Sequence, residues 1–209
     1  MTNYFYINCD KLNKIPKANK ENWLAEIKLL KNEITQNAKV LQVGCMDGTR
    51  IISLLKARSD LNITGLDIEK EFLAIARENL KKQHLKAQLV EGDITKRLPL
   101  SGFDYVICLN NTLGYIRDDK TATENMKRLG KKVVISVYGE KFTDDLGLAY
   151  FKSIGLKINR IEDNIFQTDD SDNIKRYTRN EVNSWGGEVT ETPIGYYCVI
   201  DAAAGSVSS

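Results

Sequence analysis

The sequence predicts an α/β fold: a doubly wound, mostly parallel sheet of about seven strands with helices on both faces. Two observations predict it. Short apolar runs alternate with helix-like segments through the first two thirds of the chain, and a last pair of strand-like runs lies near its end. The 209 residues, 42% of them hydrophobic, are enough to bury the core of one such unit. We therefore expect one domain over residues 1–201.

The N-terminal segment, residues 1–37, is predicted to be helical before the first strand. Within residues 18–35, four apolar side chains recur at the spacing of an amphipathic helix. They are Trp23, Ile27, Leu30 and Ile34. We expect this stripe to face the sheet.

Five strands and three helices are expected to alternate next, which is the pattern of a parallel sheet. The strand-like runs are residues 39–43, 62–67, 87–91, 103–109 and 132–138. The helix-like segments are residues 49–57, 70–82 and 121–129. Thr121 with Glu124 three positions later has the pattern of a capping box, so we expect the third of these helices to begin there.

The chain changes character after the fifth strand and a helix at about residues 143–154. Residues 155–178 alternate polar and apolar side chains around an acidic turn, which favours an antiparallel hairpin insertion. A second capping box, Thr178 with Glu181, predicts a short helix through Trp185, and GGEVTET and IGYYCVI then predict a final strand pair. We expect the tail, residues 202–209, to be disordered.

Composition excludes several functions. The 30 Lys plus Arg and 28 Asp plus Glu give a formal charge of +2, so nothing indicates nucleic acid as a partner. No apolar run has the length of a membrane span, and the first residues lack the pattern of a signal peptide. We therefore expect a cytoplasmic protein with no membrane partner, either a monomer or a homodimer.

The cysteines and the single histidine indicate no metal site. The four cysteines are Cys9, Cys45, Cys108 and Cys198. They lack metal-ligand spacing, and three of them lie in apolar strand-like runs, where cysteine is a small buried hydrophobe. His84 lies between a helix and a strand, where we expect a solvated loop residue.

The stretch most informative about function is VLQVGCMDGTR, residues 40–50, followed by Asp67 in ITGLDI. A strand that ends in glycine and then a helix, with an acid at the end of the next strand, is how parallel sheets hold a nucleotide-type cofactor. Gly44 lets the backbone turn and approach the ligand, and Asp67 can accept hydrogen bonds from ribose hydroxyls. A dinucleotide site has glycine at the first, third and sixth positions of this loop, where this chain has Gly44, Met46 and Thr49. The pattern therefore favours a nucleoside without pyrophosphate.

VLQVGCMDG resembles the first motif of class I S-adenosylmethionine (SAM) dependent methyltransferases, which reads roughly VLDVGCGTG. Three further segments follow in that family's order: GLDIEKEFLAIAREN (65–79), VEGDI (90–94) and FDYVICLNNTLGYI (103–116). The resemblance covers residues 38–138 and implies a Rossmann-like fold with SAM as the cofactor and S-adenosylhomocysteine (SAH) as its product. The chain departs from the motif at Gln42, where the family usually has an acid, and at Met46, where it usually has glycine.

The resemblance also implies site residues. Those implied to bind the cofactor are Val43, Gly44, Cys45, Gly48, Asp67, Ile68, Asp93, Ile94 and Asn110. Asn111 and Tyr115 would position the reacting groups, and Tyr4, Tyr6 and Thr112 would contact the methyl acceptor. ICLNNTLGYI is similar to a segment of small-molecule N-methyltransferases and lacks the Asn/Asp-Pro-Pro-aromatic signature of enzymes that methylate base amino groups. This favours a small-molecule acceptor, methylated on N or O, with residues 155–178 as a cover for it.

Methyl transfer depends mainly on holding donor and acceptor in near-attack geometry, so no obligatory catalytic side chain is expected. Two alternatives remain. Gln42 and Met46 suggest a non-catalytic SAM or SAH binding protein with a degenerate first motif. A nicotinamide oxidoreductase is the other alternative, and the missing glycines argue against it.

Overall fold

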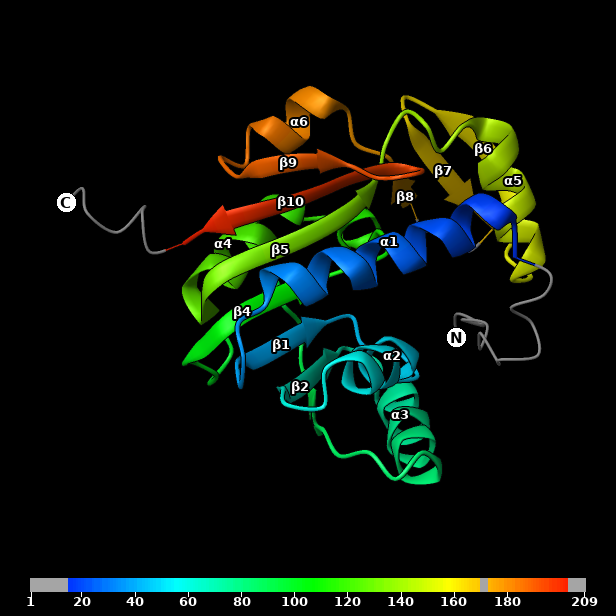
Figure 1. Cartoon of the computed structure of the whole chain (residues 1–209). Helices are drawn as coiled ribbons and strands as arrows, with labels where there is room; N and C mark the ends of the chain where they lie inside the picture. The colour runs from blue at the N-terminus through cyan, green and yellow to red at the C-terminus, as the bar shows by residue number, and fades with distance from the viewer. Residues whose placement is uncertain (1–14, 170–172, 203–209) are drawn as a thin grey trace.

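The computed structural model describes residues 15–169 and 173–202 and contains a seven-stranded sheet in the order β3-β2-β1-β4-β5-β10-β9 (Figure 1). Its strands are β1 (Lys39–Val43), β2 (Asn62–Asp67), β3 (Gln88–Glu91), β4 (Phe103–Cys108), β5 (Gly130–Tyr138), β9 (Glu188–Glu191) and β10 (Gly195–Asp201). Strands β1 to β5 are parallel to one another, and β10 runs antiparallel to β5 and β9. The predicted doubly wound, mostly parallel sheet is confirmed.

The strand order reverses between β1 and β4. The chain starts at β1 in the middle of the sheet, runs outward through β2 and β3, and then returns to build β4 and β5 on the other side of β1. Open α/β sheets bind ligands outside the carboxyl ends of the strands at such a reversal. The loops that follow β1 and β4 are therefore where a ligand site is expected.

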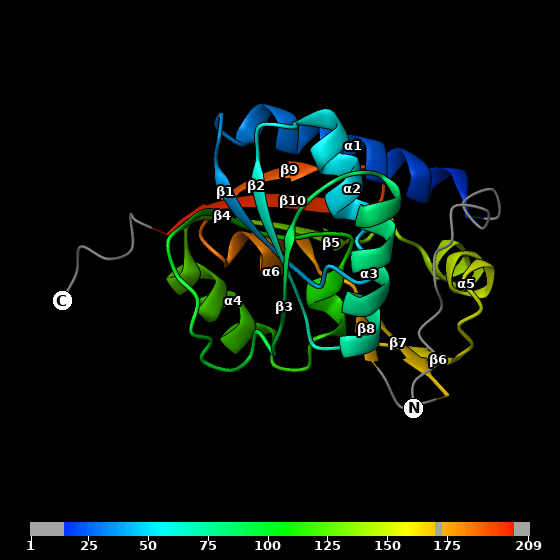
Figure 2. The ribbon, with the colours of Figure 1, turned by 90° about the horizontal axis from the view of Figure 1, so that it is seen from below.

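Helices cover both faces of this sheet, as the sequence predicts (Figure 2). They are α1 (Lys17–Glu33), α2 (Thr49–Ala57), α3 (Lys70–Lys82), α4 (Asp119–Leu129), α5 (Asp144–Ser153) and α6 (Arg179–Asn183). Neighbouring residues of one strand enter opposite cores: Val133 packs in the cluster that contains residues of α4 and α6, whereas Val134 packs with residues of α1, α2 and α3. Because both faces are buried, the strands read as continuous apolar runs.

The insertion after α5 is antiparallel, as predicted, but it forms a sheet of three strands in place of a simple hairpin. These are β6 (Ile158–Glu162), β7 (Ile165–Thr168) and β8 (Asn173–Lys175). The sequence predicts one acidic turn, whereas β6 and β7 are already joined by a two-residue turn. Its residues Asp163 and Asn164 both have positive φ, 47° and 66°, as a type I′ hairpin turn requires.

α1 buries the predicted apolar side, where Leu30 and Ile34 are buried and Ile27 packs against the same core, and it buries polar side chains as well. Its buried residues are Asn19, Asn22, Glu26 and Leu30. Of the predicted stripe, Trp23 and Ile27 are only half-buried. Periodicity marks the apolar side of a helix and does not show that Glu26 is buried, because its partners Asn110 and Ser136 lie far along the chain.

The two predicted capping boxes have different outcomes. The one at Thr178 is confirmed, because its side chain accepts from the Glu181 amide and Glu181 accepts from the Thr178 amide in return. The one at Thr121 is wrong. α4 starts two residues earlier, and the side chain of Asp118 is the cap, accepting a hydrogen bond from the Thr121 amide at 3.1 Å.

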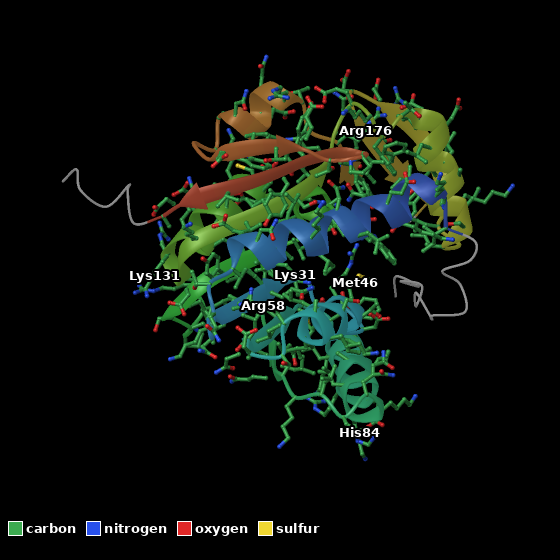
Figure 3. The ribbon with its side chains drawn as sticks, in the orientation of Figure 1. Lys31, Met46, Arg58, His84, Lys131 and Arg176 are labelled. Atoms are coloured by element: carbon green, nitrogen blue, oxygen red, sulfur yellow. The ribbon has the colours of Figure 1, made fainter. Side chains whose placement is uncertain are left out.

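Other expectations can be checked on the described part of the chain. Cys45, Cys108 and Cys198 are buried and free, whereas Cys9 lies outside the described residues. His84 is exposed after α3, well away from Met46 (Figure 3). Within residues 15–169 and 173–202, no helix has the length and apolarity to cross a bilayer, and no group of three or more His, Cys, Asp or Glu is arranged to hold a metal ion.

Candidate functional site

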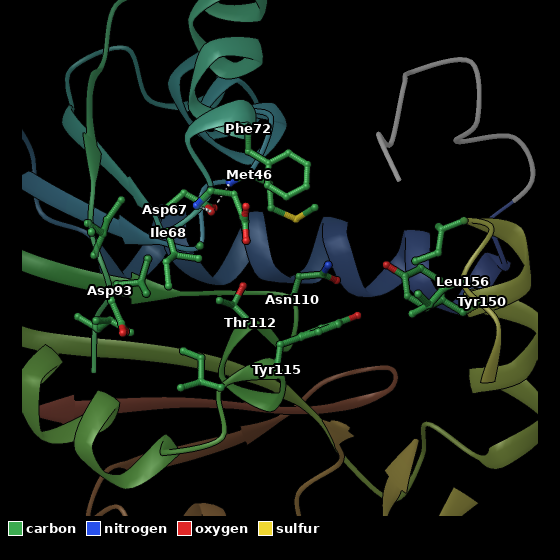
Figure 4. A pocket seen from close by; sticks show the side chains of 18 residues that line it. Met46, Asp67, Ile68, Phe72, Asp93, Asn110, Thr112, Tyr115, Tyr150 and Leu156 are labelled. Atoms are coloured by element: carbon green, nitrogen blue, oxygen red, sulfur yellow. Dashed lines mark hydrogen bonds between the residues drawn. The ribbon is translucent and has the colours of Figure 1, made fainter. Parts of the chain in front are cut away.

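A cavity of about 330 Å³ lies at the carboxyl ends of β1, β2 and β4, where the strand order reverses (Figure 4). Strand ends, loops and helices supply the polar and aromatic side chains of its lining. These are Asp67, Glu69, Phe72, Asp93, Asn110, Thr112, Tyr115 and Tyr150. The rest of the lining is Val43, Gly44, Met46, Leu66, Ile68, Gly92, Ile94, Ile116, Ile154 and Leu156. A concave, mostly apolar cavity with a few polar groups is typical of small-ligand sites.

The loop after β1 forms one side of this cavity. Gly44 has a φ of +66°, and a Cβ on it would lie 2.2 Å from Cγ2 of Thr112, so only glycine lets the loop after β4 come this close. Met46 also has positive φ, 45°, which is uncommon for a residue with a side chain. Its side chain lines the cavity, and its amide donates to Oδ2 of Asp67 at 2.7 Å (Figure 4).

Asp67, the last residue of β2, is only 7% exposed. Its Oδ1 accepts from the Glu69 amide at 3.0 Å, and its Oδ2 accepts from Met46. Burial raises the pKa of Asp67 above its ordinary value of 3.8, while these backbone hydrogen bonds oppose the rise. The two carboxylate oxygens have about four lone-pair sites, more than the backbone donors occupy, so the carboxylate can still accept from a ligand hydroxyl.

The far end of the cavity is formed after β3. Oδ1 of Asp93 accepts from the amide and the hydroxyl of Thr95, at 2.8 and 2.7 Å, which fixes this turn. Ile94 is buried beside it, whereas Ile68 across the cavity is 60% exposed. A large aliphatic side chain left exposed on a cavity wall offers a flat apolar surface to a planar ligand.

Two consecutive asparagines follow β4, and the structure separates their roles. Both have positive φ, 52° at Asn110 and 61° at Asn111. Asn110 lines the cavity. Asn111 is fully buried and does not line it: its Nδ2 donates to the Lys175 carbonyl at 3.1 Å, and its Oδ1 accepts from the Tyr138 amide at 3.0 Å. Asn111 thus holds β8 and β5 against the loop.

Phenols and aliphatic side chains form the end of the cavity opposite Asp93 (Figure 4). Tyr115 comes from the turn after β4, and Tyr150 comes from α5 with its hydroxyl pointing toward Asn110. Burial raises the pKa of Tyr150, and hydrogen bonds with Tyr138 and Asn110 oppose the rise. Among the described residues that line this cavity there is no Lys, Arg or His.

A second cavity of about 40 Å³ adjoins the first and shares Gly44, Met46, Phe72, Asn110 and Thr112 with it. The smaller cavity is also lined by residues that do not line the larger one: Trp23, Gln42, Cys45, Asp47, Thr49, Arg50 and Leu109. Two buried polar atoms here have no hydrogen-bond partner in the structure, Nη2 of Arg50 and Oε1 of Gln42. Because an unpaired buried donor or acceptor is costly, these atoms fit a polar ligand group.

The structure brings most of the predicted cofactor residues together. Val43, Gly44, Asp67, Ile68, Asp93, Ile94 and Asn110 line the larger cavity, and Cys45 lines the smaller one. Gly48 lines neither: its φ is +78°, and a Cβ on it would lie 3.1 Å from that of Ala76, so it allows α2 to pack on α3.

The residues predicted to position the reacting groups or contact the acceptor are only partly in view. Tyr115 of the first group and Thr112 of the second line the larger cavity, although the hydroxyl of Thr112 donates to the Leu109 carbonyl at 2.8 Å. Tyr4 and Tyr6 lie outside the described residues.

Sequence reasoning missed Phe72, Tyr150 and Arg50. Arg50 directly follows the glycine motif, so a search for a cation there could have found it. Phe72 is an apolar residue of α3 like those that only pack the core. Tyr150 comes from a helix after the last parallel strand, which no local motif connects to the site.

The sheet order and the position of these cavities are those of a ligand-binding open α/β domain. Residues 40–132 match the family described as "Methyltransferase domain". This part of the chain, which contains the loop after β1 and Asp67, is therefore similar to a methyltransferase domain.

Two curated relatives differ in what they are named for. The carboxy-S-adenosyl-L-methionine synthase of Campylobacter concisus is 35% identical over 46% of this chain and 40% of its own length. The release factor glutamine methyltransferase of Streptococcus pneumoniae is 30% identical over 71% of this chain and 50% of its own length. The chain thus spans at most about half the length of these relatives.

Solved structures share the fold over nearly the whole chain. The PH0226 protein from Pyrococcus horikoshii has a TM-score of 0.68 at 18% identity and covers 96% of both chains. A putative SAM-dependent methyltransferase from Methanococcus maripaludis has a TM-score of 0.62 at 17% identity, covering 88% of this chain and 87% of its own. At these identities the likeness establishes the fold.

Proposed function

We propose that this protein binds SAM and transfers its methyl group to N or O of a small-molecule acceptor. The observation that carries the proposal is the single cavity that runs from Asp67 and Asp93, past Asn110, to the phenols of Tyr115 and Tyr150. It therefore offers a nucleoside site and an acceptor site joined by one opening.

The residues present fit SAM. Asp67 would accept from the ribose hydroxyls, Ile68 would pack on the adenine, and Asp93 with Ile94 would contact the adenine edge. In the smaller cavity, the unpaired Nη2 of Arg50 and Oε1 of Gln42 suit the carboxylate and the ammonium of the methionine end. Gln42 thus supplies a hydrogen-bond acceptor where the family usually has an acid.

SAM, when bound, supplies a methyl group already activated on a sulfonium. The protein's part is to hold donor and acceptor together and exclude water, which can lower a barrier by about 7–11 kcal/mol. Because the pKa of Tyr150 is raised, its phenol is protonated near neutral pH and acts as a hydrogen-bond donor there, not as a base. This supports an acceptor that attacks through a lone pair it already has, such as a neutral amine.

The charge of the larger cavity's lining also distinguishes methyl transfer from the reaction for which one relative is named. A carboxylated methyl group, as in carboxy-S-adenosyl-L-methionine, would place an anion at the transfer site. The described residues lining that cavity provide no cation to meet it. This supports simple methyl transfer over synthesis of that compound.

The proposal is tested by calorimetric titration of the purified protein with SAH, with NAD as the control. We expect SAH to bind with micromolar affinity and NAD not to bind, because the loop after β1 lacks the glycines of a pyrophosphate site. Methyl transfer from SAM is then measured on a panel of small amines and hydroxy compounds. Absence of SAH binding would overturn the proposal.

A second function, a SAM or SAH binding protein without catalysis, is supported by one observation. Met46 occupies a left-handed conformation at the junction of the two cavities, where its side chain takes space beside the ligand. Met46→Gly should relieve this strain and bind SAH about tenfold more tightly. If the wild type and Met46→Gly both bind SAH tightly and neither methylates any compound of the panel, the result would favour SAM or SAH binding without catalysis.

A further inference from the structure

A carboxylate is buried on the N-terminal helix beside the two cavities. The side chain of Glu26 on α1 is 0% exposed. Its Oε1 accepts from the backbone amide of Asn110 at 3.0 Å and from Oγ of Ser136 at 2.6 Å. Its Oε2 pairs with Nη1 of Arg50 at 3.0 Å. One side chain of α1 therefore contacts the loop after β4, strand β5 and the start of α2.

Trp23, one turn earlier on α1, contacts the same two site residues. Its indole Nε1 donates to Oδ1 of Asn110 at 2.9 Å, and the guanidinium of Arg50 lies over its ring, 4.2 Å from the centroid. An indole N–H can only donate, so the Asn110 atom that meets it is the carbonyl oxygen. This fixes the orientation of the amide, and Nδ2, which has two N–H groups, keeps one for a ligand beside the hydrogen bond between Asn110 and Tyr150.

These contacts also orient the guanidinium. Because Nη1 of Arg50 is held by Glu26 and the plane lies on Trp23, Nη2 is the donor left buried and unpaired at the smaller cavity. A fixed guanidinium loses less freedom when it binds a carboxylate than a mobile one.

We propose that Glu26 and Trp23, the α1 pair, are positioning residues that hold Arg50 and Asn110 for the amino-acid end of the cofactor. The inference rests on the proposed function and assigns a role in it to the N-terminal helix. A buried ion pair is weak evidence for a contribution to stability, because apolar residues of similar volume often serve as well. Here two partners of Glu26, Asn110 and Arg50, line the smaller cavity and are also the partners of Trp23, which is what a positioning role requires.

The test compares two ligands that differ only at the amino-acid end. SAH and 5′-methylthioadenosine share the nucleoside, and only SAH carries the carboxylate and ammonium. Glu26→Gln keeps the shape and one acceptor oxygen, but its amide nitrogen then faces Nη1 of Arg50 donor to donor. We expect the Kd of SAH to rise about tenfold or more, and that of 5′-methylthioadenosine to stay within about twofold.

The matched control is Glu33→Gln, on the same helix, whose carboxylate pairs with Lys132 away from the site. It should leave both affinities unchanged. Equal weakening of both ligands by Glu26→Gln, or no weakening of SAH, would overturn the inference. Wild-type protein that binds no SAH would instead overturn the proposed function.

A second variant keeps the test decisive if Glu26→Gln does not fold. Trp23→Phe retains a ring for Arg50 and removes the shorter of the two hydrogen bonds to Oδ1 of Asn110, leaving the one from the Tyr138 hydroxyl at 3.4 Å. We expect it to weaken SAH severalfold while 5′-methylthioadenosine binds as before. An unchanged ratio of the two affinities would overturn the role of the α1 pair.

Discussion

At the scale of single residues, Asp67 joins the two loops that would hold a nucleoside. It accepts one backbone hydrogen bond from the loop after β1 and one from the start of α3. Both bonds need an acceptor oxygen, and so would the ribose hydroxyls. The same carboxylate therefore fixes the two loops by backbone hydrogen bonds and would bind the ribose of the ligand.

The affinity for SAH should depend on pH through Asp67. Because burial raises its pKa above 3.8, the carboxylate takes up a proton at a higher pH than an ordinary aspartate. The neutral carboxyl is a weaker acceptor, so the Kd of SAH should rise as pH falls from about 7 through this raised pKa, and stay flat above it. Calorimetry at several pH values measures this.

Asp67→Asn is the control for that titration, because its amide does not titrate. It should bind SAH weakly, and the part of the pH dependence due to Asp67 should vanish. A wild-type Kd that stays constant at every acidic pH at which the protein remains folded would contradict the role of Asp67. An equal pH dependence in both proteins would assign the effect to another group, such as the buried Asp47, whose pKa is also raised by burial.

The residues that sequence predicts well are those whose backbone position defines their role. Gly44 and Asp67 stand at the ends of adjacent strands, so the spacing of the strands places them. Asn110 and Asn111 show the limit. They are neighbours of the same type and similar φ, yet one lines the cavity and the other is buried, because β5 and β8 supply the partners of Asn111.

At the scale of elements, the two capping sequences provide a direct comparison. Thr178→Ala should lower the free energy of unfolding by about 1 kcal/mol, because it removes a side-chain acceptor from the first turn of α6. Thr121→Ala should cost less than about 0.5 kcal/mol, because Asp118 is the cap of α4. Urea unfolding of both variants measures the difference, and equal losses would contradict the assigned caps.

Element boundaries were predictable where an apolar run is bounded by glycine or charge. Strands β1 and β2 and helices α2 and α3 have the predicted limits. The polar face of α1 could not be predicted, because the partners of Glu26 lie 84 and 110 residues away at Asn110 and Ser136. Local periodicity contains no information about such contacts.

At the scale of the whole molecule, the inserted three-stranded sheet shares a hydrophobic core with the end of β5 and with α5. Phe166 of β7 is fully buried, with its ring centroid 5.8 Å from that of Phe142 and 5.1 Å from that of Phe151. The same apolar cluster contains Tyr150, whose phenol lines the larger cavity. The insertion thus packs against the end of the larger cavity that we propose for the acceptor, for which the resemblance implies residues 155–178 as a cover.

If the chain is one cooperative domain over residues 1–201, as the sequence predicts, damage in the insertion should destabilise all of it. Phe166→Ala should lower the free energy of unfolding by about 3–5 kcal/mol, because it leaves a cavity among aromatic rings. Urea unfolding should shift to the same lower midpoint by far-UV circular dichroism and by the fluorescence of Trp23 and Trp185, which lie on or beside α1 and α6. Leu148→Ala, at an exposed site on α5, is the control and should have little effect. A separate early transition that leaves the tryptophan signal in place would show instead that the insertion unfolds independently.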